Sequence, residues 1–209
     1  EKAFKVLAYA AKLAALHSGS KQLASIAKQV SRARQIFVLL HWVKYADDAR
    51  AALSETPVEF RVVSLVETLL GCLSDILGDM ATLGDLYIIP LSAERVNSLE
   101  WWAAAIDALY SLVAMVTSAV HLARKQSALL TTTLHEKPGM QRKITLQRLS
   151  LLKYCCDFLK DCNSIGLRGL NGTGVPLKLS VSAGLTSGLI STHNWLVKLQ
   201  RQHDGAKSS

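Results

Sequence analysis

Apolar residues recur with helical spacing through most of this chain, and few turn signals interrupt them. The pattern predicts basic amphipathic helices in 1–54, an apolar helix with an acidic face in 57–90, a transmembrane helix in 97–125, an amphipathic helix in 139–163, a glycine-rich linker at 166–175 and a second transmembrane helix in 176–198. We therefore expect one all-α domain. It should be a membrane-associated bundle of long amphipathic helices with two to three membrane-embedded helices.

The first predicted helix, residues 1–16, carries its lysines within one narrow arc and its apolar side chains on the opposite face. The residues expected to bind a membrane surface are Phe4, Lys5, Leu7 and Lys12 here, and Lys21, Lys28 and Arg32 in the next helix. A cationic stripe beside a broad apolar face suits a helix that lies in the membrane interface. A surface helix packed on a bundle, with its lysines in water, is the alternative.

The second predicted helix runs from Lys21 to about Leu53. Its apolar residues alternate in steps of three and four and form one packing seam, namely Leu23, Ile26, Val30, Ala33, Phe37 and Leu40. Such a seam packs against a helix of the same chain or against a second copy. A homo-oligomer is therefore one expectation.

Three acids share one face of the apolar stretch 57–90: Glu67, Asp75 and Asp79. Each carboxylate at mid-bilayer would cost about 2.5 kcal/mol or more, so this face should avoid lipid. It should turn toward the bundle, a water-filled groove or the headgroups. A polar path that attracts cations is a second functional hypothesis.

Two segments have the features of membrane spans. Trp101 and Trp102 precede an apolar stretch of about 20 residues that Arg124 and Lys125 close. In the last segment small residues recur at every fourth position, and this helix-packing ridge consists of Ser180, Gly184, Gly188 and Thr192. A ridge of this kind lets another helix backbone approach closely in lipid.

Composition supports a membrane protein, because 50% of the residues are hydrophobic and only 19% are charged. The formal charge of +8 is uneven: residues 1–54 hold nine basic and three acidic side chains, 55–123 hold two and nine, and 124–209 hold thirteen and four. Basic ends favour an anionic phospholipid membrane as the partner and a cytosolic location for both termini. Nucleic acid is not expected, since no motif for it accompanies the charge.

The sequence shows no enzyme signature. The four cysteines lack zinc-site spacing, and the glycine-rich segment lacks the lysine and hydroxyl pair of a phosphate loop. Nucleophile, metalloprotease and dinucleotide motifs are absent as well. We expect no catalytic residue, no metal and no cofactor.

The order of these elements resembles the peroxin-eleven family of peroxisomal membrane proteins. The stretch EKAFKVLAYAAKLAAL is similar to the family's lysine-bearing first helix, and LASIAKQVSRARQIFVLLHWVKYADD to its second. LSDILGDMATLGDLYII resembles the central segment, with Asp79 at the position of the usual aspartate. LLKYCCDF and GLTSGLIST are similar to the later leucine-rich and glycine-serine segments.

The resemblance implies a peroxisomal membrane location, or a glycosomal one if the chain is a divergent member such as those of kinetoplastids. It also implies self-association, contact with the fission machinery, and elongation of the organelle membrane before fission by amphipathic-helix insertion. A pore for small solutes in the same membrane is the alternative function. A helical protein–protein interaction module is the third.

Overall fold

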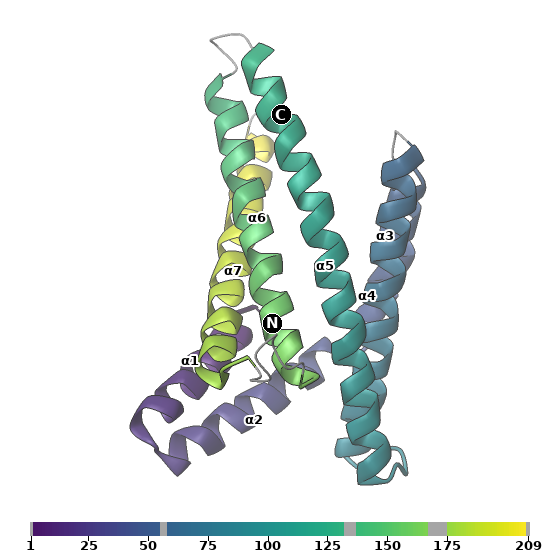
Figure 1. Ribbon diagram of the computed structural model, residues 1–209, viewed down its shortest axis with the longest axis vertical. Helices are drawn as coiled ribbons and strands as arrows, with labels where there is room; N and C mark the ends of the chain where they lie inside the picture. The colour runs from purple at the N-terminus through teal and green to yellow at the C-terminus, as the bar shows by residue number, and fades with distance from the viewer. Residues whose placement is uncertain (1, 55–57, 132–136, 167–174, 208–209) are drawn as a thin grey trace.

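The computed structural model describes residues 2–54, 58–131, 137–166 and 175–207 (Figure 1). These residues form an all-α fold without strands, as predicted. The elements are α1 (Lys2–Ser18), α2 (Lys21–Val38), the 3-10 helix η1 (His41–Lys44), α3 (Tyr45–Leu53), α4 (Val58–Asp85), α5 (Ala93–Thr131), α6 (Lys137–Ser164) and α7 (Leu177–Lys207).

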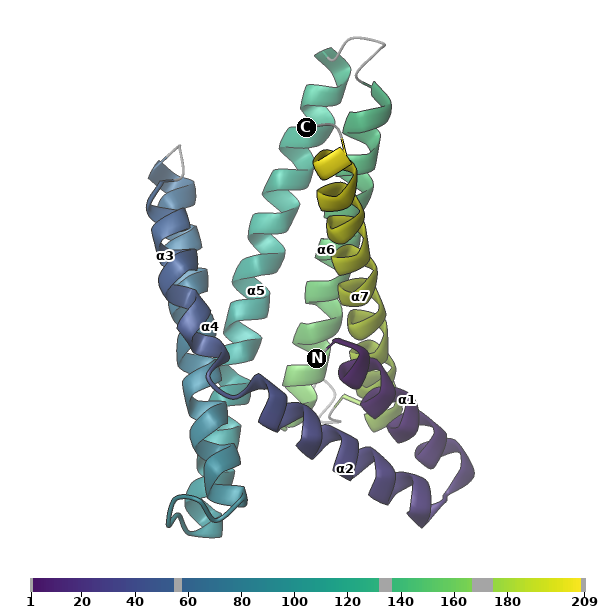
Figure 2. The same ribbon diagram turned by 180° about the vertical axis from the view of Figure 1, so that it is seen from behind.

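The long helices α5, α6 and α7 lie side by side, with α6 in contact with both of the others (Figure 1). Helix α4 packs on α5, and α3 packs on α4. Helices α1 and α2 form a hairpin at one end of the molecule, seen from behind in Figure 2, where α1 contacts α7 and the end of α2 approaches α4. We call this unit the α1–α2 hairpin.

The prediction of one continuous helix from Lys21 to Leu53 is wrong, because α2 ends at Val38 and is followed by the separate helices η1 and α3. Leu40 adopts a left-handed backbone conformation, with φ at 64°, and its amide donates to Asp79 Oδ2 of α4 at 2.8 Å. His41 Nδ1 lies 3.2 Å from Asp75 Oδ2 one turn away. Contacts with α4 therefore stabilise a turn that helical periodicity does not reveal.

Helix boundaries also differ from the prediction in the middle of the chain. The helix expected over 57–90 ends at Asp85, where Tyr87 adopts a φ of 58°. The amide of Ile88 then donates back to Leu83 O at 3.0 Å. This hydrogen bond is typical of an α-helix that ends at a residue in the left-handed conformation, here Tyr87. The helix expected over 97–125 is longer, from Ala93 to Thr131.

Side chains are distributed with small residues inside and large apolar residues outside. The buried positions include the alanines Ala8, Ala27, Ala52, Ala81, Ala108 and Ala114 and the serines Ser74, Ser111, Ser118, Ser180 and Ser187. Large apolar side chains face outward, for example Leu69 of α4 at 59% exposed and Val116 of α5 at 60%. An outer surface of this kind is suited to lipid rather than to water.

Among the described residues, one helix is long and apolar enough to cross a membrane, Ala93–Leu130 of α5. It contains the first predicted span. The second predicted span, 176–198, lies in α7 and falls short of the same criterion. Insertion of α7, and with it the number of embedded helices, stays a prediction.

The small-residue ridge of α7 receives α1. A Cβ atom added to Gly184 would overlap the ring of Tyr9, and one added to Gly188 would lie 3.2 Å from Val6 Cγ2. Ser180 of the same ridge is only 5% exposed. The absence of side chains at the two glycines therefore lets α1 approach the α7 backbone.

We expect Gly184→Ala to destabilise the protein, although alanine favours a helix over glycine by about 1 kcal/mol. The new methyl group must displace the Tyr9 ring, and overpacking of this kind costs about 1–3 kcal/mol. Thermal unfolding in detergent, followed by circular dichroism, measures the difference. The control is Gly78→Ala in α4, where nothing lies within 4 Å of the added Cβ. Stabilisation by both substitutions would contradict the packing of α1 on α7.

Candidate functional site

A buried polar contact joins three helices at the N-terminal end of α1. Lys5 Nζ donates to Asp157 Oδ1 of α6 at 3.1 Å and to Ser187 Oγ of α7 at 2.9 Å. Ser187 Oγ in turn donates to the same Asp157 oxygen at 2.6 Å, and Lys153 Nζ lies 3.5 Å from Asp157 Oδ2. We call Lys5, Lys153, Asp157 and Ser187 the α1 anchor.

Burial and charge act together on the groups of the α1 anchor. Burial alone would raise the pKa of Asp157, but the facing ammonium groups, Lys5 first, outweigh it and hold this pKa well below its usual range. Burial lowers the pKa of Lys5 to about 8, and the attraction of Asp157 offsets only part of that effect. At neutral pH both groups are charged, so α1 is held by an ion pair shielded from solvent.

A polar cavity of about 630 Å³ lies between the α1–α2 hairpin, α4, α5 and α6. Lys160 and Asp161 line it as an ion pair at 2.9 Å, and burial raises the pKa of Asp161 to about 6 despite Lys160. In the same cavity Ser74 Oγ of α4 donates to Asp107 Oδ1 of α5 at 2.9 Å. Asp107, which lies within the candidate span of α5, thus receives a hydrogen bond inside the protein, as a carboxylate at membrane depth requires.

The three acids predicted to form one polar path are separated by the structure. Asp75 and Asp79 line the polar cavity and bind the turn after α2, whereas Glu67 lines a different pocket beside Tyr45 and Tyr110. Asp75 and Asp79 therefore have a structural role in positioning the hairpin. A conducting path stays a prediction.

The residues predicted to bind a membrane surface fall into two groups. Lys21 and Lys28 are exposed on α2, and Arg32 is exposed but lies 2.9 Å from Asp85 Oδ2. Lys12 is half-buried over the ring of Tyr9, at 5.1 Å from its centroid, and Lys5 belongs to the α1 anchor. For Lys5 the expected exposure to lipid headgroups is corrected, because its charge is paired inside the bundle.

The apolar face of the hairpin is turned outward. Phe4 stacks on Phe37 with ring centroids 5.3 Å apart, yet Phe37 is 68% exposed. Leu7 and Leu40, each one turn from these rings, are 58% and 64% exposed. The predicted seam of α2 is thus only partly covered. We call Phe4, Leu7, Phe37 and Leu40 the hairpin apolar patch.

Comparison with known proteins gives one result. A family model described as Peroxisomal biogenesis factor 11 (PEX11) matches residues 1–196 of the 209. The chain belongs to the PEX11 family. Neither the curated proteins nor the solved structures contain a significant match.

The PEX11 family consists of peroxisomal membrane proteins involved in peroxisome proliferation and membrane remodelling, and it is not an enzyme family. The match extends from α1 into α7, so it includes both the α1 anchor and the hairpin apolar patch. The family resemblance inferred from the sequence is therefore confirmed over nearly the whole chain.

Sequence reasoning did not assign a role to Asp157, Ser187 or Asp161. One signal for Asp157 was available: this acid has lysines four residues before and three residues after it on one face of α6, Lys153 and Lys160. An acidic side chain between two basic ones suggests a residue that forms an ion pair. Its partner in α1, Lys5, is however 152 residues away in the sequence. No local pattern identifies that partner.

We expect Asp157→Asn to loosen α1 from the bundle, because Lys5 would remain in a site that is only 15% exposed without its counter-charge. Breaking a buried pair from one side costs about 3 kcal/mol or more. Trypsin cleavage within α1 of the protein in vesicles should become faster, and the unfolding temperature should fall.

The control for this prediction is Asp47→Asn, whose pair with Arg50 is 82% exposed at the acid and should matter little. The double variant Lys5→Met, Asp157→Leu removes both charges and should recover most of the stability. An Asp157→Asn protein as stable and as protease-resistant as the parent would show that the α1 anchor does not hold the hairpin.

Proposed function

We propose that this chain elongates the peroxisomal or glycosomal membrane by inserting the α1–α2 hairpin into the cytosolic leaflet while α5 spans the bilayer. The observation that carries the proposal is the hairpin apolar patch, since Leu7, Phe37 and Leu40 are each more than half exposed at the end of a membrane protein. A wedge in one leaflet increases its area relative to the other and bends the bilayer.

The charge of the hairpin adds a second attraction to the membrane surface, from the face of α2 opposite Phe37. Lys21 and Lys28 are exposed on α2, and a basic side chain near an anionic surface contributes about 1 kcal/mol. Lys5 has a separate task, because its ion pair holds α1 on α6 and α7. The hairpin is thus coupled to the spanning bundle, and bending of the leaflet is transmitted to the whole protein.

Self-association belongs to this proposal as the step that concentrates hairpins at one site on the membrane. The outward apolar faces of α4 and α5 offer surfaces for a second copy in lipid. The hairpin lies on the cytosolic side in this scheme, where the fission machinery can reach the elongated membrane. Helix α7 runs from the hairpin toward the opposite end of α5, so the C-terminal end of α7 lies on the other side of the bilayer in this scheme, and not in the cytosol as the charge pattern predicted (Figure 1).

We expect Lys21→Ser with Lys28→Ser to reduce the tubulation of phosphatidylserine-containing vesicles severalfold, because about 2 kcal/mol of lipid attraction is lost. Leu7→Ser with Leu40→Ser should reduce it similarly through the loss of apolar contact. Electron microscopy of reconstituted vesicles counts the tubules. Variants are compared at equal membrane insertion, measured by carbonate extraction.

The matched control is Arg142→Ser with Lys143→Ser, which removes the same charge from exposed positions of α6 outside the hairpin. It should tubulate like the parent. If the control loses as much activity as the hairpin variants, net charge rather than the hairpin drives remodelling. If neither hairpin variant loses activity, hairpin insertion is excluded as the mechanism.

A further inference from the structure

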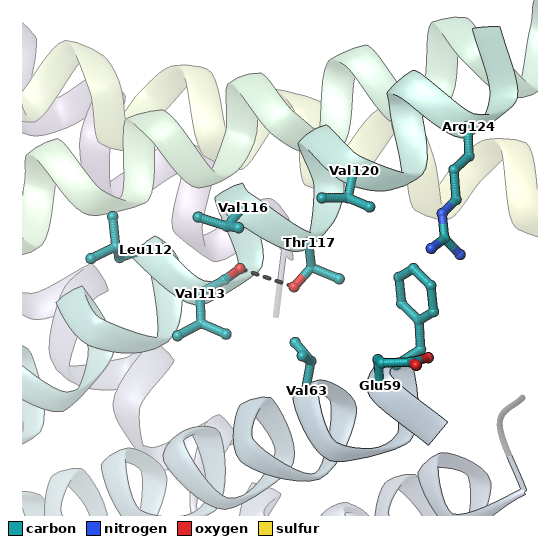
Figure 3. Close-up of a pocket in the computed structure, with 9 residues that line it drawn as sticks. Glu59, Val63, Leu112, Val113, Val116, Thr117, Val120 and Arg124 are labelled. Atoms are coloured by element: carbon teal, nitrogen blue, oxygen red, sulfur yellow. Dashed lines mark hydrogen bonds between the residues drawn. The ribbon is translucent and has the colours of Figure 1, made fainter. Parts of the chain in front are cut away.

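An apolar groove of about 460 Å³ lies between α4 and α5, far from the hairpin. Its lining comprises Glu59, Phe60, Val63, Leu112, Val113, Val116, Thr117, Val120 and Arg124. Figure 3 shows Val63 of α4 facing the valines of α5 across the opening. The hydroxyl of Thr117 donates to Val113 O at 3.0 Å, so it is satisfied within its own helix.

Opposite charges lie together at one end of this groove. The Arg124 guanidinium lies over the ring of Phe60, 4.2 Å from its centroid, and Glu59 is on the same side of the opening (Figure 3). Leu112 and Val113 form the other end. The site is therefore long and apolar with one zwitterionic end.

The position of the groove along α5 matches one leaflet of a bilayer. Trp101 and Arg124 are separated by about 34 Å along the helix, close to the hydrocarbon thickness of about 30 Å. Leu112 then lies near the midplane, and the distance from Leu112 to Arg124, about 18 Å, is close to half of that thickness. A groove that extends from the headgroup level to the midplane has the length of one lipid acyl chain.

We propose that the α4–α5 groove binds one phosphatidylethanolamine molecule of the leaflet on the Arg124 side. Its acyl chain fills the valine-lined groove, its phosphate accepts hydrogen bonds from Arg124, and its primary ammonium donates to Glu59. Guanidinium–phosphate contacts are among the stronger hydrogen bonds in proteins, and the stacked Phe60 holds this guanidinium in place. A headgroup carrying both charges complements both side chains, unlike an anionic headgroup.

This lipid site goes beyond the proposed remodelling function and does not depend on it. It uses α4 and α5, whereas the membrane wedge uses α1 and α2. A variant that loses the bound lipid and still tubulates vesicles separates the two proposals.

The test uses the full chain in phosphatidylcholine vesicles with a trace of phosphatidylethanolamine that carries a photoactivatable acyl chain. After illumination, mass spectrometry locates the labelled residues. We expect label at Val63, Val113 and Val116 to exceed label at Leu109, which is 49% exposed on α5 but outside the groove. Val116→Trp, which fills the groove, should reduce the label about tenfold, and Leu109→Trp should leave it unchanged. Circular dichroism verifies that both variants remain folded.

Competition with unlabelled lipid tests the headgroup. Phosphatidylethanolamine should displace the label at lower concentration than phosphatidylglycerol, and Glu59→Gln should remove this preference. Equal labelling of Leu109 and the groove residues would show that the groove contacts bulk lipid only and binds no particular molecule. Disulfide crosslinking between two copies of a Val116→Cys variant, together with an absence of lipid label in the groove, would show that a second copy covers the groove. Either result overturns the proposal, as does equal competition by the two lipids.

Discussion

Close approach of helix backbones through alanine, glycine and serine is the constraint on which the rest of this structure depends. Gly184 leaves room for the Tyr9 ring, Ser187 is completely buried, and Ala81 and Ala114 lie at 2% exposure. Small residues cannot bury much apolar area, so in water such a bundle would gain little from the hydrophobic effect. In lipid, van der Waals contact and internal hydrogen bonds take over that role. The outward leucine and valine side chains then contact lipid acyl chains, which are as apolar as these side chains.

Polar contacts decide how the small-residue helices are arranged. The α1 anchor fixes α1 on α6 and α7, and Asp79 fixes the turn that ends α2. Between these two points the α1–α2 hairpin is held in an orientation that leaves its apolar patch uncovered. The PEX11 family is involved in membrane remodelling. In the mechanism proposed above, this fixed orientation is what allows the hairpin to act as a wedge in one leaflet.

Most of the helices could be predicted from the sequence, because helical periodicity is a local property. The candidate span in α5 could also be predicted, from its apolar length and its aromatic and cationic ends. The break at Leu40 could not, since it depends on two acids of α4 that lie 34 and 39 residues away from their partners. Nor could the orientation of α1. In a membrane protein either the lysine face or the apolar face can turn inward, and only the position of Asp157 decides that Lys5 does.

The central claim is that lipid covers the outward apolar faces of the helices, while the faces made of small residues are buried and contact neither lipid nor water. Spin labels at single cysteines measure this directly in reconstituted vesicles, through collision with apolar oxygen and with a water-soluble nickel chelate. Labels at Leu69 and Val116 should collide often with oxygen and rarely with nickel, and a label at Ala114 should collide rarely with both. Frequent collision with nickel at Leu69 and Val116 would contradict the account, because these faces would then lie in water.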